Sequence, residues 1–435
     1  MKKIVLLFLC LTVMGVHAAR IVDGINYELN REEMYALVVK LDYPNKYSGD
    51  IVIPETIVIG EYEFDVLGID EEAFEGCPIT SISLPESIQL IDDNAFASCT
   101  KLTSIKLPDS VWGIGNEAFY NCRNVTELKL PHNEVLVLDC AFAYMQSLKE
   151  IVFPDEWTMI GYPETVTDFF KGCTSLKRIV LGKNIQAIYA GAFNECESLK
   201  EVICPADGVL EYIGEEAFAE TGLESMRFLP KTVKHIDTDA FSECPNLKEF
   251  FIPASVEQLG GVNSLDYRCT SLVFEDTKVP LKLLGMDHSA FEEMYLGRPI
   301  ESSQSYLPCG RNMLALKKLV FGASFSAGTN WYFGNHVTDI YSYASNPAPI
   351  KCKFTDQTYD NATLYVPKGT KSAYASQSNF APFFIINEMT DEQTGIHDMS
   401  DMHAGDAAVY TMGGSRVRKP VRGLNIINGK KVLVK

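Results

Sequence analysis

Cysteine is the residue type whose number and spacing could most readily support chemistry in this chain of 435 residues. The chain has twelve cysteines, and six of them follow a phenylalanine at a fixed distance of three residues. These six are Cys77, Cys99, Cys122, Cys173, Cys196 and Cys244. Stacked strands would bring such thiols about 5 Å apart, near the Cα separation that a disulfide tolerates.

We nevertheless expect a column of buried free thiols that behave as small apolar residues. Met145 and Thr221 occupy the same position in other copies, and no second cysteine is lost with them. A metal site would need a C-x₂₋₄-C pair or nearby histidines, and the repeated cysteines have neither.

The other groups that could do chemistry are scattered. The seven histidines form no H-E-x-x-H pattern, and the chain has no G-x-S-x-G, P-loop or G-x-G-x-x-G motif. His397 and His403, with Asp398 and Asp401, could bind a divalent cation, but a solvated charge run in a linker explains them more simply. We therefore predict no catalytic residue, no cofactor and no metal.

The cysteines belong to a tandem repeat. Phenylalanine, usually in an Ala-Phe pair, recurs every 22 to 28 residues. The repeated residues are Phe74, Phe96, Phe119, Phe142, Phe170, Phe193, Phe218 and Phe241. Each is followed by a short apolar strand, commonly ending in proline, and then by a second apolar pair. One such unit cannot bury its apolar face alone, so the copies are predicted to stack around one continuous core.

Alternation within the strands predicts the direction of each side chain. Ile105 and Leu107 are expected to point into the core, and Lys106 away from it. Pro108 ends its strand because it has no N–H to donate. The second apolar pair is often Ile-Gly, and its glycine, as at Gly115, is expected to permit the next turn of the chain. Strands of neighbouring copies are predicted to pair in parallel.

The outward strand position changes character along the repeats. In order it holds Ser83, Lys106, Lys129, Val152, Val180, Ile203, Arg227 and Phe251. Aliphatic side chains on adjacent copies would form a contiguous apolar patch, which marks a binding or self-association surface. We predict a partner-binding face at Val152, Val180, Ile203, Arg227 and Phe251. The competing interpretation is ordinary β-propensity on strands that the tail or the N-terminal cap covers.

Acidic residues precede most Ala-Phe pairs, for example at Asp70, Glu117 and Glu216. Stacking would align them in a ridge that could bind divalent cations or attract basic partners. We favour a structural interpretation, in which they lie at the N-termini of short helical turns whose N–H groups need acceptors. The longest insertion between regular copies, Tyr162 to Val166, is either a specific contact or a neutral loop.

Composition divides the chain into seven segments. They are a signal peptide at 1–18, an N-terminal cap at 19–68, regular repeats at 69–260, divergent repeats at 261–345, a closing module at 346–389, an acidic linker at 390–406 and a basic β-hairpin tail at 407–435. Lys2 and Lys3 precede a short apolar stretch, and Ala18 ends a segment suited to signal peptidase, so we expect an exported protein. Asn428-Gly429 predicts a two-residue hairpin turn in the tail.

Net charge argues against one class of partner, and hydropathy argues against a membrane-spanning segment. The formal charge is −19, which argues against a nucleic acid, because phosphates require clustered lysine and arginine. No apolar run approaches the roughly 20 residues that a transmembrane helix needs. The tail differs from the rest, with seven basic residues and no acidic one.

The unit A-F-x-x-C-x-x-L-x-x-I-x-L-P and its period resemble the BspA-like class of bacterial leucine-rich repeat proteins. The resemblance implies an α/β to mostly β solenoid, a right-handed coil of short parallel strands with an N-terminal hairpin cap and a small C-terminal β module. Here cysteine precedes the strand, unlike in the general leucine-rich repeat consensus. No long convex helix is evident, so short turns and 3₁₀ pieces are expected on that side.

The resemblance also implies a surface protein that binds host matrix proteins, other cells or glycans, and no enzyme. The tail resembles C-terminal sorting or anchoring segments of exported Bacteroidetes proteins, which makes sorting machinery or the envelope a second expected partner. The expected location is the cell surface, the outer membrane or the medium, with the periplasm as an alternative. Two other functions stay open: a structural envelope protein anchored by its tail, and a hydrolase with an unrecognised site in residues 261–345.

Overall fold

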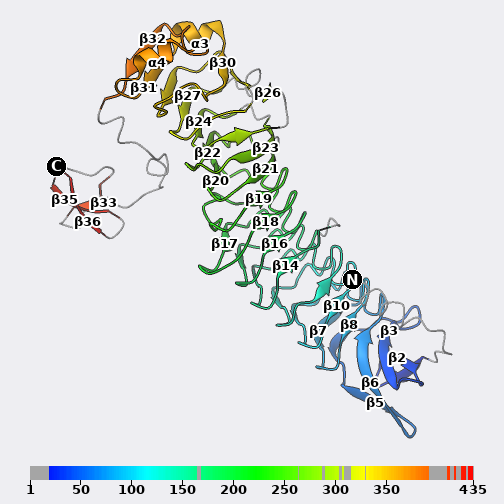
Figure 1. Cartoon of the computed structure of the whole chain (residues 1–435). Coiled ribbons are helices and arrows are strands. Elements are labelled where there is room, and N and C mark those ends of the chain that lie inside the picture. Colours follow the sequence, from blue (N-terminus) through cyan, green and yellow to red (C-terminus); the bar gives the residue numbers. More distant parts are fainter. Residues whose placement is uncertain are drawn as a thin grey trace.

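The computed structural model shows an elongated solenoid whose successive turns stack along one axis (Figure 1). It describes residues 19–163, 168–262, 264–286, 290–302, 306–307, 315–328 and 330–390. In the tail it describes four short strands: β33 (Val409–Thr411), β34 (Arg416–Val417), β35 (Gly423–Ile427) and β36 (Lys430–Val434). These strands form an antiparallel sheet, in which Ile427 of β35 pairs with Lys430 of β36.

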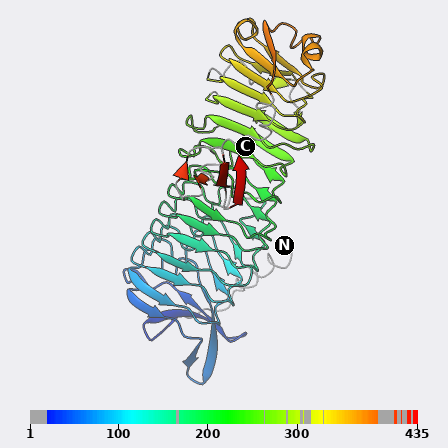
Figure 2. The same ribbon diagram turned by 90° about the vertical axis from the view of Figure 1, so that its left-hand side faces the viewer.

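Most turns of the solenoid contribute a strand to each of two ladders of parallel strands, seen side-on in Figure 2. The first ladder consists of β7 (Ile79–Ser83), β9 (Ser104–Lys106), β11 (Glu127–Lys129), β13 (Glu150–Val152), β15 (Arg178–Val180), β17 (Glu201–Ile203), β20 (Glu249–Ile252), β22 (Ser271–Phe274), β24 (Glu293–Leu296), β27 (Lys318–Phe321), β29 (Asp339–Ser342), β31 (Thr363–Val366) and β32 (Ile385–Glu388). The second consists of β8 (Leu90–Ile91), β10 (Gly113–Ile114), β12 (Leu136–Val137), β14 (Met159–Ile160), β16 (Ala187–Ile188), β18 (Tyr212–Ile213), β19 (His235–Ile236), β21 (Gln258–Val262), β23 (Leu281–Met286) and β25 (Ile300–Glu301). The parallel pairing confirms the predicted arrangement.

The repeated phenylalanines form a continuous stack through the core. Neighbouring rings from Phe74 to Phe241 lie nearly parallel, with centroids 4.9 to 5.8 Å apart. Each ring is at most 1% exposed. Ring stacking at this separation adds to the free energy gained by burial. The predicted superposition of the aromatic position is confirmed.

The cysteine column runs beside this stack, and its thiols are free. Cys99, Cys122 and Cys196 each donate from Sγ to the carbonyl oxygen of the phenylalanine one turn earlier, at 3.0, 3.2 and 3.3 Å. Burial raises the pKa of Cys122 and Cys173 to about 12, so neither forms a thiolate readily. The position therefore favours a small residue that can also donate a hydrogen bond, a preference that the sequence interpretation missed.

The segment before each Ala-Phe pair is not a helical turn. Glu72, Glu117 and Glu216 have φ of 52° to 56°, in the left-handed region. Alternate N–H groups of the segment point to the next turn of the solenoid, as in the bond from Phe74 N–H to the Ala95 carbonyl at 2.7 Å. The prediction that acidic residues cap helices here is wrong. Among the described residues, no group of three or more His, Cys, Asp or Glu side chains is placed to hold a metal ion.

The glycines of the Ile-Gly pairs allow close approach between turns of the solenoid. A Cβ on Gly115 would lie 2.4 Å from the Asp93 nitrogen, and one on Gly214 would lie 2.8 Å from the Ala190 nitrogen. Gly161, by contrast, has a φ of +83° and permits a turn as expected. Gly115 was expected to permit a turn of the chain, but it is required instead by the close approach of the preceding turn of the solenoid.

Additional elements cover both ends of the core. The N-terminal strands are β1 (Arg20–Val22), β2 (Ile25–Asn30), β3 (Tyr35–Val39), β4 (Gly49–Val52), β5 (Thr56–Ile59) and β6 (Tyr62–Ile69). Asp23 and Gly24 both have positive φ, as the two-residue turn between β1 and β2 requires. The described C-terminal helices are α3 (Asp356–Asn361) and α4 (Lys371–Ala375). In the described part of the chain, no helix has the length and apolar character needed to span a membrane.

Candidate binding face

The outward side chains of the first ladder form rows along the solenoid, because the strands pair in register. Val152 lies opposite Val180, and Val180 lies opposite Ile203. Val152 is 53% exposed, and Val180 and Ile203 are half-buried. We call these three residues the apolar row. They are three of the five residues predicted for a partner-binding face.

Phe251 does not extend the apolar row to the surface. It is only 8% exposed, and the guanidinium of Arg227 lies 4.3 Å from the centroid of its ring. The same guanidinium bonds to Glu249 at 2.8 Å, which holds it over the ring. The prediction of an exposed Phe251 is therefore wrong. Strand alternation does direct Phe251 outward, but a long side chain from the preceding turn covers it, and Arg227 takes its place on the surface.

Charged rows flank the apolar row. Arg178 lies between two glutamates, with Nη1 in contact with Glu150 and Nε 3.2 Å from the carboxylate of Glu201. Exposed lysines precede the strands at Lys149, Lys177, Lys200 and Lys248. Ion pairs this exposed contribute little stability, typically about 0 to 1 kcal/mol, so their main effect is to set the pattern of charge on the face.

Both ladders are interrupted between the same two turns of the solenoid. Leu107 N–H donates to the Lys129 carbonyl of the following turn at 3.1 Å. In the same way, Phe153 N–H donates to the Val180 carbonyl at 2.9 Å. The equivalent bond from Leu130 N–H to the Val152 carbonyl is missing. Throughout residues 126–160, all of them described, no pairing joins β11 to β13 or β12 to β14. We call this interruption the seam.

The seam differs from the other breaks in the first ladder. Strands β7 and β9 do not pair, and neither do β17 and β20, but the second ladder continues past both points through β8–β10 and through β18–β19–β21. Only at the seam do the described strands of both ladders stop together.

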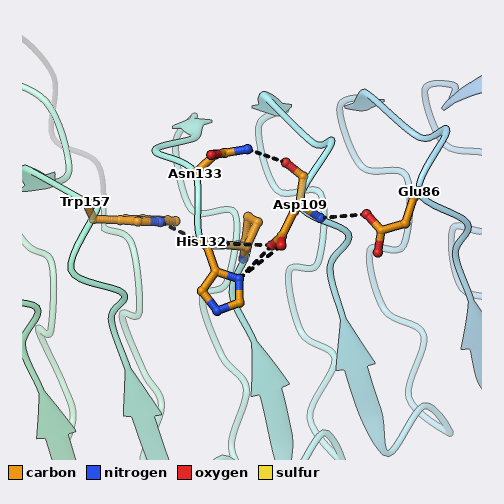
Figure 3. Close-up of polar contacts among 6 residues, drawn as sticks. Glu86, Asp109, His132, Asn133 and Trp157 are labelled. Carbon is orange, nitrogen blue, oxygen red and sulfur yellow. Dashed lines mark hydrogen bonds and ion pairs between the residues drawn. The ribbon is translucent and has the colours of Figure 1, made fainter.

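Glu134 and Trp157 account for the seam. The third residue after the strand-ending proline is normally aliphatic and buried, as at Val111, but here it is Glu134. A carboxylate is costly to bury, so the turn opens and Val135, 3% exposed, takes the core position. Trp157 of the next turn, 1% exposed, donates from Nε1 to the freed Pro131 carbonyl at 3.0 Å (Figure 3).

Side chains bridge the seam on the side of the second ladder. The Glu134 carboxylate accepts a hydrogen bond from Thr158 N–H at 3.1 Å, and the Tyr162 hydroxyl donates to the Val135 carbonyl at 3.3 Å. In the described structure, no hydrogen bond or ion pair joins β11 to β13 on the first-ladder side, where a groove of about 720 Å³ opens. This seam groove is lined by Glu86, Lys106, Leu107, Asp109, Thr126, Glu127, Leu128, Lys129, Leu130, His132, Lys149, Glu150, Val152 and Pro154.

One wall of the seam groove is a chain of polar contacts across three turns (Figure 3). Glu86 accepts the Asp109 N–H at 3.1 Å, and Asp109 accepts the His132 N–H at 2.9 Å. The His132 ring contacts the same carboxylate through Nδ1 at 3.0 Å. These hydrogen bonds from His132 lower the pKa of Asp109, and the bond to Asp109 raises the pKa of His132. The wall is thus ordered although it is exposed.

The seam groove was missed by the sequence interpretation, which found the apolar row beside it. The available signal was Glu134, a charged residue at a position that holds Ile88, Val111, Trp157, Val233 and Val256 in other turns. Four other expectations fall partly or wholly outside the described residues. They are the signal peptide at 1–18, the insertion at Tyr162 to Val166, described only as far as residue 163, the acidic linker at 390–406, described only at residue 390, and the group of His397, Asp398, Asp401 and His403.

The family model for the BspA type leucine rich repeat region matches this chain in six copies. The matched residues are 68–163 and 165–296, which make up just over half of the chain. The chain belongs to the BspA-type leucine-rich repeat family. Leucine-rich repeat proteins with this fold are typically non-catalytic, and the family suggests a role in protein interaction or at a surface.

Several solved structures are similar to this BspA-type chain. A leucine-rich repeat protein from Bacteroides ovatus is 18% identical, covers 85% of this chain and 100% of its own, and gives a TM-score of 0.49. A leucine rich cell surface protein from Faecalibacterium prausnitzii is 19% identical, with coverages of 88% and 99% and a TM-score of 0.43. The leucine rich repeat protein of T. pallidum is 25% identical, with coverages of 49% and 91% and a TM-score of 0.39. No curated protein matches the chain.

Proposed function

We propose that this BspA-type leucine-rich repeat protein is an exported binding module that holds a protein or glycan partner on its first ladder. The apolar row carries this proposal, because Val152, Val180 and Ile203 lie in register on three adjacent strands between charged rows. Exposed apolar side chains in a contiguous row gain free energy when a partner removes them from water. The charged flanks would select the partner by complementarity. No catalytic role is proposed.

Export and a surface location are part of the proposal. The support is in the sequence: two lysines and a short apolar stretch at the N-terminus are typical of a signal peptide. The basic tail, opposite in charge to an acidic chain, would contact the envelope or a sorting machinery. Detection of the protein by antibody on intact cells, and its loss after deletion of residues 407–435, would test this part.

The binding proposal is tested by the double variant Val180→Asp/Ile203→Asp. Two carboxylates in the apolar row are expected to weaken binding at least about tenfold, which corresponds to about 1.4 kcal/mol. The measurement is binding of the purified protein to immobilised extracellular-matrix proteins and to a glycan array.

The matched control is Val58→Asp, which changes a 63% exposed valine on β5 in the N-terminal cap. Circular dichroism and thermal unfolding establish that both variants are folded. If the folded double variant bound as well as the wild type and the control, the apolar row would not be the binding surface.

A further inference from the structure

We infer that the seam is a hinge, about which the parts of the solenoid before and after it rotate relative to each other. The axis of this hinge lies on the side of the coil that carries the Ala-Phe pairs, which we call the Ala-Phe side. The two ladders are the sides that open and close. The hinge would act whatever partner the apolar row holds.

Neighbouring turns with regular pairing are held together by backbone hydrogen bonds on all three sides. Between the last two turns before the seam, Phe96 N–H donates to the Ala118 carbonyl at 2.7 Å on the Ala-Phe side. Strand β9 pairs with β11 on the first ladder, and Leu138 N–H donates to the Ile114 carbonyl at 2.9 Å on the second. Bonds on three sides fix the angle between two turns, because rotation about one side breaks the bonds of the other two.

The seam keeps only one of these three sides. Phe119 N–H donates to the Ala141 carbonyl at 2.8 Å, so the Ala-Phe side is bonded as it is in the turns before. On the ladder sides, no backbone hydrogen bond joins residues 126–138 to residues 149–161, all of which the structure describes. A single line of bonds between two turns is the arrangement of a hinge, in which only a few residues have to change their φ and ψ.

The aromatic stack keeps the core continuous beside the hinge axis. The rings of Phe119 and Phe142 lie 5.7 Å apart, with an angle of 11° between their planes. Both values fall within the range of the other pairs in the stack. Stacked rings attract each other, but no directional bond fixes the angle between them. The two parts of the solenoid therefore stay attached while the angle between them changes.

The hydrogen bonds that cross the ladder sides of the seam all use a side chain. They involve the indole of Trp157, the carboxylate of Glu134 and the hydroxyl of Tyr162. A side chain can exchange its partner for water when two turns separate, and it can bond again when they close. Backbone groups paired along a ladder have to separate together. The contacts across the seam therefore limit the hinge without locking it.

Rotation about the hinge would change the shape of the first-ladder face. Before the seam the outward position holds Lys106 and Lys129, and after it Val152 and Val180. The seam groove lies between these two parts of the face, so opening or closing the hinge would widen or narrow it. A partner that contacts both parts would select one hinge angle from those that the free protein samples.

The test is double electron–electron resonance on the full chain. Spin labels are attached to genetically encoded ketone side chains, so that the native cysteines stay unmodified. The seam pair is labelled at Thr80 and Lys177, and the control pair at Lys149 and Lys248. All four residues are exposed and occupy equivalent positions of their turns, and each pair spans four steps from one turn to the next.

The two pairs are matched in a second respect. Each crosses one break that affects the first ladder alone, between β7 and β9 for the seam pair and between β17 and β20 for the control pair. Only the seam pair also crosses the interruption of both ladders. A difference between the pairs therefore reports on the seam.

Freezing traps the distribution of hinge angles, so rotation appears as a wider distribution of distances between the labels. We expect the distribution of the seam pair to be at least about twice as wide as that of the control pair. Trp157→Phe/Tyr162→Phe keeps both rings and removes two hydrogen-bonding groups from the seam. It is expected to widen the seam-pair distribution by a further factor of about 1.5 and to leave the control pair unchanged.

Two results would overturn the inference. Equal widths for the two pairs in the wild type would show that the seam is as rigid as the rest of the solenoid. An unchanged seam-pair width in the folded Trp157→Phe/Tyr162→Phe variant would show that the side chains across the seam do not limit a hinge there. Circular dichroism establishes that the labelled proteins and the variant are folded.

Discussion

Replacing Phe119 with alanine is expected to lower the free energy of unfolding by about 3–5 kcal/mol. The ring is fully buried and stacks on Phe96 at 5.0 Å and on Phe142 at 5.7 Å. Its removal leaves a cavity between two rings. The neighbouring turns cannot close it readily, because Phe119 N–H donates to the Ala141 carbonyl at 2.8 Å and fixes their separation. Urea denaturation followed by circular dichroism measures the change.

Thr126→Ala is the control for this experiment, since Thr126 is exposed on the same turn of the solenoid. It is expected to cost less than about 1 kcal/mol. A loss for Phe119→Ala no larger than that of the control would mean that the aromatic stack does not support the solenoid.

Gly260→Ala is expected to destabilise the protein by about 3 kcal/mol, at the upper end of the usual cost of overpacking. A Cβ at this position would lie 2.1 Å from the Thr238 nitrogen and 2.5 Å from the Asp237 carbonyl carbon, both backbone atoms of the preceding turn. Backbone atoms fixed by a ladder cannot move aside as a flexible side chain can. Thermal unfolding measures the loss.

Gly328→Ala is the matched control, because the nearest atom to its Cβ would be the Ile300 oxygen at 4.0 Å. It is expected to leave the stability within about 0.5 kcal/mol of the wild type. Equal losses for the two glycines would contradict close approach between turns as the reason for Gly260.

The fold could be predicted from the sequence because one unit recurs many times. The phenylalanine spacing predicts a stack, and the rings from Phe74 to Phe241 lie one above another as expected. Parallel pairing follows from the same repetition, since equivalent strands of successive turns run in the same direction. The left-handed backbone conformation before Ala-Phe could not be predicted from the sequence, because glutamate, as at Glu72 and Glu117, rarely indicates a positive φ.

The binding face could be predicted only in part from the sequence. Alternation places Val152, Val180 and Ile203 outward, and the structure agrees. Strand alternation does not predict which outward residues a neighbouring side chain covers. Phe251 is such a case, because Arg227 covers it. The seam depends on the glutamate at position 134 and on the volume of a tryptophan in the next turn. The spacing from Phe119 to Phe142 is still 23 residues, so the repeat period gives no sign of the seam.

Amide hydrogen exchange at three equivalent positions tests the central claim, a single stacked solenoid with one seam through both ladders. Leu107 and Phe153 N–H groups donate to the next turn at 3.1 and 2.9 Å, and Leu130 N–H has no such acceptor in the described structure. The account predicts that Leu130 exchanges at least about tenfold faster than Leu107 and Phe153 under native conditions. Equal protection at all three amides would show a continuous ladder with no seam, and would contradict the account.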